Sequence, residues 1–435
     1  MVGSLFHAFQ VPDVRQRLGW VAFGFALFTL SVHVGMPGVN TEVWGRLVAS
    51  GDVFRFLGMM TGGALNHFAV TALGITPYIN ASIIMQLLTV VIPQLHEMQK
   101  EGGEMGRRKL AQYTRWLTLA LCLLTGTALT VTLVRHGQAS GQPVFTMHGF
   151  GFYVMVVLAL TAGTCFMMWL GELMSEKGVG NGVSLLIFAG IVLSFPNYLN
   201  ESLKLAGVAG AGYVISLLIF FALMVGLIAA IVLIHLGQRK IPVQYPRKVV
   251  GRRVYGGQST YIPMRVNNAG VISIIFAISI LYLPYTLLQF GSQSAPWVQT
   301  LATFINTYFA PHSLVYNLVY AGLVVFFTFF YSAITFKVDD VADNMRKYGG
   351  FIPGIRPGRP TAEYLEKVLT RITLIAGLFL AFVAIAPDYF MRLTGVTTFG
   401  GLGATSMLII VGVALDTMQQ IEARLVMRHY QGFMK

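Results

Sequence analysis

Long stretches of apolar residues divide this chain, and they restrict its possible folds more than any other feature of the sequence. An α-helix needs about 20 apolar residues to cross the hydrocarbon core of a membrane. Nine runs reach that length, and a tenth, which ends at Phe195-Pro196, is shorter. The sequence therefore predicts an all-α, polytopic membrane protein with ten transmembrane helices. The runs cover residues 18–35, 75–95, 116–134, 152–171, 183–199, 213–236, 266–290, 314–336, 368–387 and 399–418.

The composition excludes most other classes of protein. Only 11% of the 435 residues are charged, and the mean hydropathy is +0.68. Soluble domains carry about a quarter charged residues, so a cytosolic enzyme, a disordered chain and a secreted domain are all excluded. Both cysteines, Cys122 and Cys165, lie in apolar runs, and no disulfide framework is expected.

The basic residues predict how the spans are oriented. With ten spans, 25 of the 30 Lys and Arg residues fall on the side that holds both termini, and 5 fall on the opposite side. Cytoplasmic loops of membrane proteins carry an excess of Lys and Arg. We therefore expect both termini in the cytoplasm.

Charged residues are missing from the interiors of the spans. Such a residue at mid-bilayer costs about 2.5–3.5 kcal/mol, so it is kept only for a purpose. Glu172 and Asp416 lie at span ends, which disfavours an ion-coupled pump. The chain also lacks a G-x-x-x-x-G-K-[ST] loop, and His96-Glu97 is not followed by the second histidine of a zinc-protease motif. We expect no enzyme activity, no cofactor and no metal site.

The stretch from Phe54 to Gly74 is apolar but irregular. Gly62-Gly63 interrupt it, and Asn66-His67 place polar groups within it. Irregular backbone at membrane depth survives only inside protein or beside a water-filled cavity, so one interpretation is a re-entrant segment that fills a cavity. An amphipathic helix on the outer membrane surface is the alternative. The residues alone favour neither.

Two connections on the basic side are unusually large. Residues 238–265 hold seven basic residues and no acidic one, and 249–255 with Gly256-Gly257 predict a β-hairpin or extended arm. Such an arm suits a polyanion such as ribosomal RNA, or else anionic lipid headgroups. Residues 337–367 contain a tip rich in glycine and proline, which presents Arg356 as a bidentate donor. This tip favours a docking site for a cytoplasmic partner.

Several blocks of sequence resemble the SecY family of bacterial protein-translocon channel subunits, and the resemblance covers nearly the whole chain. They are ALGITPYINASIIMQLLTVV (72–91), EMGRRKLAQY (104–113), GELMSEKGVGNGVSLLIFAG (171–190), YGGQSTYIP (255–263), residues 349–371 and IVGVALDTMQQIE (410–422).

The resemblance implies a channel with two five-helix halves, an inverted pseudo-repeat, around a central pore. The halves are residues 1–205 and 206–435. Such a channel passes unfolded polypeptides across the bacterial inner (plasma) membrane and releases apolar helices sideways into the lipid. The implied partners are SecE-like and SecG-like small membrane subunits, the SecA ATPase motor, the ribosome, signal peptides, nascent chains and anionic lipids. A secondary solute transporter is the competing reading.

The resemblance also assigns roles to residues. A plug corresponds to residues 54–72. Its central residues are Gly62, Gly63, Ala64, Leu65, Asn66, His67 and Phe68. The motor or ribosome docks on Arg247, Lys248, Arg252, Arg253 and Arg356.

A ring of apolar side chains lines the family's pore. It corresponds here to Ile79, Ile83, Val183, Ile187, Ile275 and Ile409. The first two pairs have i,i+4 spacing, which places each pair on one helix face, and β-branched side chains are stiff. Val183 is smaller than the isoleucine usual there. The sequence before the last span is longer than the family's, which leaves Met407 and Ile410 as alternatives to Ile409.

Overall fold

The computed structural model of the protein describes most of the chain. It covers residues 11–50, 58, 61–100, 103–140, 144–147, 149–245, 248–250, 253–255, 259–268, 270–290, 300, 303, 313–399 and 404–432. The chain forms two compact units, which we call unit 1 (residues 1–217, 283–303 and 395–435) and unit 2 (residues 218–282 and 304–394). The last predicted span therefore clusters with the N-terminal spans.

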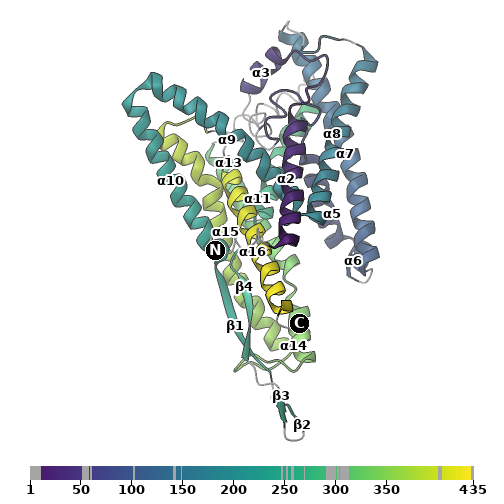
Figure 1. The fold of residues 1–435 in the computed structure, drawn as a ribbon, viewed down its shortest axis with the longest axis vertical. Helices are drawn as coiled ribbons and strands as arrows, with labels where there is room; N and C mark the ends of the chain where they lie inside the picture. Colours follow the sequence, from purple (N-terminus) through teal and green to yellow (C-terminus); the bar gives the residue numbers. More distant parts are fainter. Residues whose placement is uncertain are drawn as a thin grey trace. The chain divides into compact units, whose positions relative to one another are not determined.

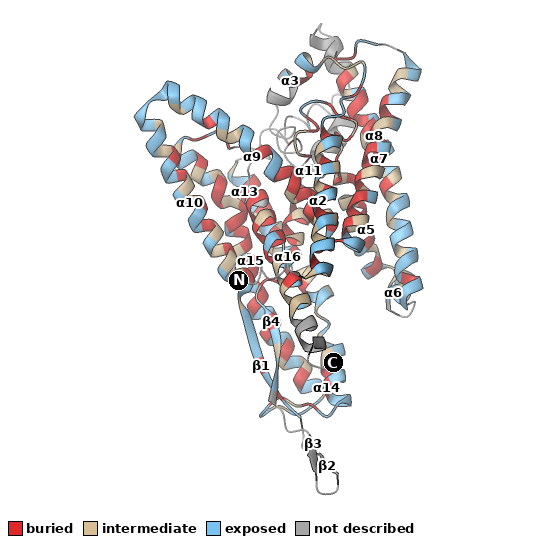
Figure 2. Ribbon diagram, in the orientation of Figure 1, coloured by how far each residue is buried: buried red, intermediate tan, exposed pale blue. Residues whose placement is uncertain are grey.

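Unit 1 is built around helix α8 (Figure 1). Helix α8 packs against α2, α7 and α9, while α9 also packs against α16, and α5 packs against α7. Ten residues of α8 are buried, and Figure 2 shows buried positions along the helices of this unit. The helices are α2 (Pro12–Val32), α3 (Thr41–Ser50), α5 (Thr76–Val91), α6 (Pro93–Lys100), α7 (Gly103–Ser140), α8 (Phe150–Lys177), α9 (Gly182–Ala209) and α16 (Ala404–Gly432).

Local signals explain where two of these helices begin or end. Asn181 is the N-cap of α9, and its side chain accepts hydrogen bonds from the backbone N–H groups of Val183 and Ser184. The chain bends by 105° between α5 and α6, at Pro93, which lacks the N–H needed to continue a helix but suits the first position of a new one.

The end of α9 corrects one prediction. The sequence places the end of the short span at Pro196, whereas the helix continues through this proline to Ala209. A proline inside a helix costs about 3 kcal/mol, so other contacts must hold the extension. Phe195 and Tyr198 contact the ring of Phe399, and the Ser202 hydroxyl hydrogen-bonds that of Thr398.

Unit 2 combines helices with a small β-structure (Figure 1). Helices α13 and α15 pack side by side, and α14 packs against α15. Its helices are α10 (Ala211–Leu236), of which residues 211–217 belong to unit 1, α11 (Ile272–Phe290), α13 (Leu314–Thr335), α14 (Val338–Lys347) and α15 (Arg359–Thr394). Its strands are β1 (Gln238–Gln244), β2 (Lys248–Val250), β3 (Arg253–Tyr255) and β4 (Ser259–Arg265).

Strands β1 and β4 form an antiparallel ribbon, and β2 and β3 form a second pair at its far end. The N–H of Val266 donates to the carbonyl of Gly237, at the base of the ribbon. Hydrogen-bonded and non-hydrogen-bonded residue pairs alternate along an antiparallel ladder. Every second residue of each strand therefore directs its N–H and C=O groups away from the partner strand. Pro242 and Pro263 occupy such outward positions, where no N–H is needed.

All ten predicted spans fall on helices, so the predicted fold class is confirmed. Among the described residues, six helices are long and apolar enough to cross a membrane, and the bent pair α5–α6 would be a seventh. Helices α2, α11 and α16 occupy the other three predicted spans. The predicted hairpin is also present, as β2 and β3.

Candidate functional site

The residues assigned to the pore ring lie on four helices. Ile79 and Ile83 lie on α5, Val183 and Ile187 on α9, Ile409 on α16, and Ile275 on α11 of unit 2. Ile83, Ile187 and Ile409 are buried, and the other three are half-buried. Unit 1 thus holds five of the six residues.

Non-helical residues 61–75, which we call the capping segment, lie against the helices of unit 1. They form consecutive turns rather than an amphipathic surface helix. Ala64, Leu65 and Phe68 are buried, while Asn66 and His67 are exposed. Residues 54–57, 59 and 60 of the predicted plug lie outside the described residues.

The backbone of Gly62 lies close to two helices of unit 1. A Cβ atom at Gly62 would lie 3.1 Å from Cζ of Phe28 on α2 and 3.2 Å from Cα of Gly190 on α9. Gly62 has a φ of 67°, which glycine adopts without strain. Gly190 is three residues beyond Ile187, on the same face of α9. The capping segment therefore reaches the helix face that carries a ring residue.

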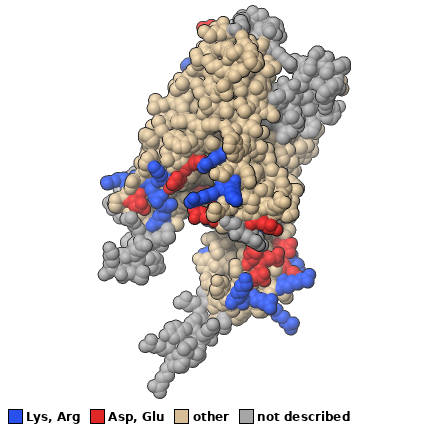
Figure 3. Space-filling model, turned by 90° about the vertical axis from the view of Figure 1, so that its right-hand side faces the viewer, with Lys and Arg blue, Asp and Glu red and all other residues tan. Residues whose placement is uncertain are grey.

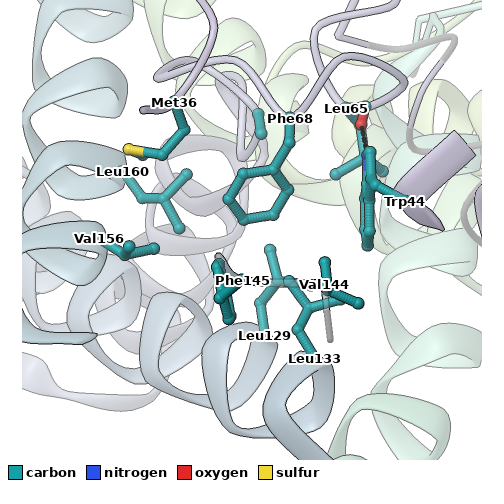
Figure 4. Packing of buried hydrophobic residues seen from close by; sticks show 11 residues of the cluster. Met36, Trp44, Leu65, Phe68, Leu129, Leu133, Val144, Phe145, Val156 and Leu160 are labelled. Atoms are coloured by element: carbon teal, nitrogen blue, oxygen red, sulfur yellow. Dashed lines mark hydrogen bonds between the residues drawn. The ribbon is translucent and has the colours of Figure 1, made fainter. Parts of the chain in front are cut away.

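A buried cluster holds the capping segment from the other side (Figure 4). The segment contributes Leu65, Phe68 and Ala72, which pack with residues of the 33–50 loop, α7, α8 and the 144–147 loop. The Trp44 indole N–H donates to the carbonyl of Leu65, the bond drawn in Figure 4. The other members are Met36, Leu129, Leu133, Val144, Phe145, Val156 and Leu160.

At the opposite end of unit 1, the loop between α8 and α9 is fixed by polar contacts. The ammonium of Lys177 lies 4.6 Å from the ring centroid of Trp20, and the Arg17 guanidinium donates to the carbonyl of Gly178 at 3.3 Å. The N–H of Gly180 donates to Gln420 Oε1 at 3.0 Å. These contacts connect the start of α9 to α2 and α16.

Charged side chains gather at helix ends. Figure 3 shows a broad surface almost free of charge, with the blue and red side chains collected toward one part of the molecule. The Arg115 guanidinium makes two hydrogen bonds to the Glu172 carboxylate, at 3.0 and 2.7 Å, and so connects α7 to α8.

Among the described residues, no group of three or more His, Cys, Asp or Glu residues could hold a metal ion.

The two large connections of unit 2 form one packed structure, whereas the sequence predicts two separate features. The N–H of Gln244 donates to the carbonyl of Phe351, and the N–H of Phe351 donates back, both at 2.9 Å. A hydrophobic core joins the ribbon, α14, the 348–358 loop and the start of α15, and we call this assembly the ribbon module. Its buried residues are Ile241, Val243, Met264, Met345, Ile352, Leu365, Val368, Leu369 and Ile372.

The ribbon module presents Arg356 to solvent. Arg356 is exposed, whereas Ile352 before it is buried and Ile355 packs against the core. The hydroxyl of Thr361 donates to the backbone carbonyl of Arg356 at 2.8 Å. The backbone of Arg356 is therefore held on both sides: Ile352, which is buried, comes before it, and the Thr361 hydroxyl bonds its carbonyl.

Two of the remaining docking candidates lie on the strand pair at the far end of the ribbon. Lys248 begins β2 and Arg253 begins β3. Arg247 and Arg252 lie outside the described residues.

Comparisons with known proteins agree with this architecture. The SecY family model matches residues 69–418, which is most of the chain. The chain belongs to the SecY family. Relatives named "Protein translocase subunit SecY" include one from Streptomyces coelicolor, at 44% identity, and one from Mycobacterium bovis, at 40% identity. Both matches cover 100% of each chain.

Solved structures show the same fold. A structure described as that of a protein conducting channel has a TM-score of 0.62 and 17% identity, and covers 95% of this chain and 93% of its own. Sec61 in a canine ribosome-channel complex has a TM-score of 0.60, at 17% identity, with the same coverage.

Membership of the SecY family establishes the general function. The protein is a multi-pass membrane protein and a channel subunit of a protein translocase. SecY proteins form a family of channel subunits rather than of enzymes, and a secondary solute transporter is not favoured.

Proposed function

We propose that this chain is the central protein-conducting channel of a bacterial inner membrane, with both termini in the cytoplasm. Unfolded secretory polypeptides pass through it, and apolar helices leave it sideways into lipid. Signal peptides and nascent chains are its clients. SecE-like and SecG-like subunits and anionic lipids surround it. The halves 1–205 and 206–435 form an inverted pair.

One observation supports a proposal for how the closed channel is sealed: Gly62 lies against Gly190, one helical turn from Ile187. We infer that the capping segment is the plug and that it covers the ring of Ile79, Ile83, Val183, Ile187, Ile275 and Ile409. A narrow apolar constriction resists ions by dewetting. A related structure supports this, because its description says that the plug domain of the SecY protein stabilises the closed state and maintains a membrane seal.

Ion leak through vesicles that contain the purified channel tests the ring. Ile83→Gly with Ile187→Gly widens the constriction, and we expect resting ion conductance to rise. Ile84→Gly with Val192→Gly is the matched control, because both side chains are exposed on the same two helices and the backbone change is identical. Equal ion conductance in the two double variants would contradict the proposed pore ring.

We also propose that the ribbon module receives the SecA motor or the ribosome. Arg356, together with Arg247, Lys248, Arg252 and Arg253, supplies the positive charge. The chain has no G-x-x-x-x-G-K-[ST] nucleotide-binding loop, so a motor, the ribosome or the membrane potential drives transport. Arg356→Glu should abolish SecA-driven transport into vesicles while channel assembly, read from gel filtration, is unchanged. Near-normal transport would overturn this assignment.

A further inference from the structure

Trp44 is a large side chain whose position the pore mechanism does not use. It lies on α3, and the Asn40 side chain caps the start of this helix by accepting from the N–H of Val43 at 3.4 Å. The N–H of Asn40 donates to the carbonyl of Val144 at 2.8 Å. Trp44 is completely buried, and its indole N–H bonds the carbonyl of Leu65 in the capping segment.

The ring of Trp44 also contacts the ring of Phe68, whose backbone conformation is unusual. Phe68 has a φ of 47°, and it is the one non-glycine residue with positive φ among those that the structure describes. A bulky residue in this region is strained. The Phe68 ring packs edge-to-face on Trp44, with centroids 5.1 Å apart, and on Phe145, at 6.2 Å.

Backbone hydrogen bonds fix only the later part of the segment to the chain that follows α2. The N–H of Met36 donates to the carbonyl of Phe68 at 3.0 Å, and the N–H of Val70 donates to the carbonyl of Val34 at 2.9 Å. Leu65 bonds within the segment, because its carbonyl accepts from the N–H of Phe68 at 3.1 Å and its N–H donates to the Thr61 hydroxyl at 3.3 Å. Its contact with α3 is the indole N–H of Trp44, which donates to the same carbonyl. The earlier part, next to α9, is thus attached to α3 through a side chain.

We propose that Trp44 is a latch that holds the capping segment in its resting position. Its N–H satisfies the Leu65 carbonyl, and its ring keeps Phe68 in the left-handed conformation. When this contact is lost, Phe68 relaxes to negative φ and the segment withdraws from α9. The latch is a positioning role, and its effect on conduction rests on the proposed function of the segment as a plug. Ordinary core packing is the alternative, and it predicts a general loss of stability instead.

The test uses the full-length channel in vesicles. Trp44→Phe keeps a ring but removes the N–H, and Trp44→Leu removes both. Trp116→Phe is the control, because Trp116 on α7 is 70% exposed. Loss of one hydrogen bond predicts a rise of about five- to tenfold in resting ion leak for Trp44→Phe, a larger rise for Trp44→Leu and no change for Trp116→Phe.

Hydrogen exchange separates a latch from a folding defect. In Trp44→Phe, exchange should accelerate at the amide of Ala69, which donates to Ala64 within the segment, and at the amide of Gly63, which donates to Gly58 just before it. The α8 amides should keep their protection. Accelerated exchange across α8, or unchanged exchange at Gly63 and Ala69, would overturn the latch.

A third variant separates the latch from the plug function. Deletion of residues 62–67 should raise the leak whether or not Trp44 acts as a latch. If the deletion leaks and the Trp44 variants do not, the latch is wrong and the plug stands. If the deletion does not leak, the proposed plug is wrong.

Discussion

The capping segment is non-helical and the ribbon module combines strands, helices and a loop, and the two regions are held in opposite ways. The capping segment contains positive φ at Gly62, Gly63 and Phe68 and contributes three side chains to the cluster in Figure 4. The ribbon module has a core of nine buried residues drawn from two strands, two helices and a loop.

This difference indicates which of the two regions can move. Burial of an apolar side chain contributes about 1.5–3 kcal/mol, so a shared core of nine makes the ribbon module hard to take apart. The segment contributes three side chains to its cluster and otherwise relies on single hydrogen bonds, each worth about 1 kcal/mol, and it contains a strained residue. We therefore expect the segment to be displaced more easily than the module.

The largest expected effect comes from a charge placed in the core of the module. Ile352→Asp buries a carboxylate without a partner, which costs about 3 kcal/mol or more. Proteolysis in membranes should cut residues 238–265 much faster in this variant. Tyr348→Asp is the control, since Tyr348 is 77% exposed on the same loop. Similar cutting rates in both variants would show that no shared core exists.

A methyl group added to the capping segment should have an intermediate effect. In Gly62→Ala, the new Cβ meets Gly190, and the left-handed conformation costs about 1–2 kcal/mol for alanine. We expect a rise of about tenfold in ion leak from vesicles. Gly212→Ala on α10, where a Cβ meets nothing within 4 Å, should leave the leak unchanged. A tight seal in Gly62→Ala would mean that the segment tolerates rearrangement there.

The smallest expected effect comes from the loss of one hydrogen bond in the ribbon module. Thr361→Val removes the bond to the Arg356 carbonyl at a cost of about 1 kcal/mol. Hydrogen exchange at the Ile355 amide should accelerate about fivefold. Thr370→Val removes a similar bond, from the exposed Thr370 hydroxyl to Glu366, and should not affect this amide. A loss of protection throughout the module would show that it is as fragile as the segment.

Hydrophobic runs were sufficient to predict the helices, because a span must satisfy its own backbone and its apolar length is visible in the sequence. The hairpin or extended arm was predicted from residues 249–255 and the Gly256-Gly257 pair that follows them. The continuation of α9 beyond Pro196 was not predictable, because it depends on Phe399 and Thr398, nearly 200 residues away. The joining of the two basic connections is also a tertiary contact, between Gln244 and Phe351.

The candidate site was less accessible from sequence than the fold. The i,i+4 spacing of Ile79 and Ile83 defines a helix face but does not say whether it meets lipid, protein or a pore. The sequence around Trp44 holds one weak signal, a tryptophan four residues after the helix-capping residue Asn40, and nothing in that pattern points to Leu65. Both features depend on which helices become neighbours.

The outward-facing prolines of the ribbon have a consequence for the polypeptides that a translocase handles. Unfolded chains carry free main-chain donors and acceptors, and an open strand edge captures such chains by adding them as a further strand. Pro242 and Pro263 remove an outward N–H from each edge, and Phe351 already occupies Gln244. Each edge of the ribbon is therefore a poorer template for an extended peptide than an edge with every N–H present, which limits capture of the unfolded chains that a translocase handles.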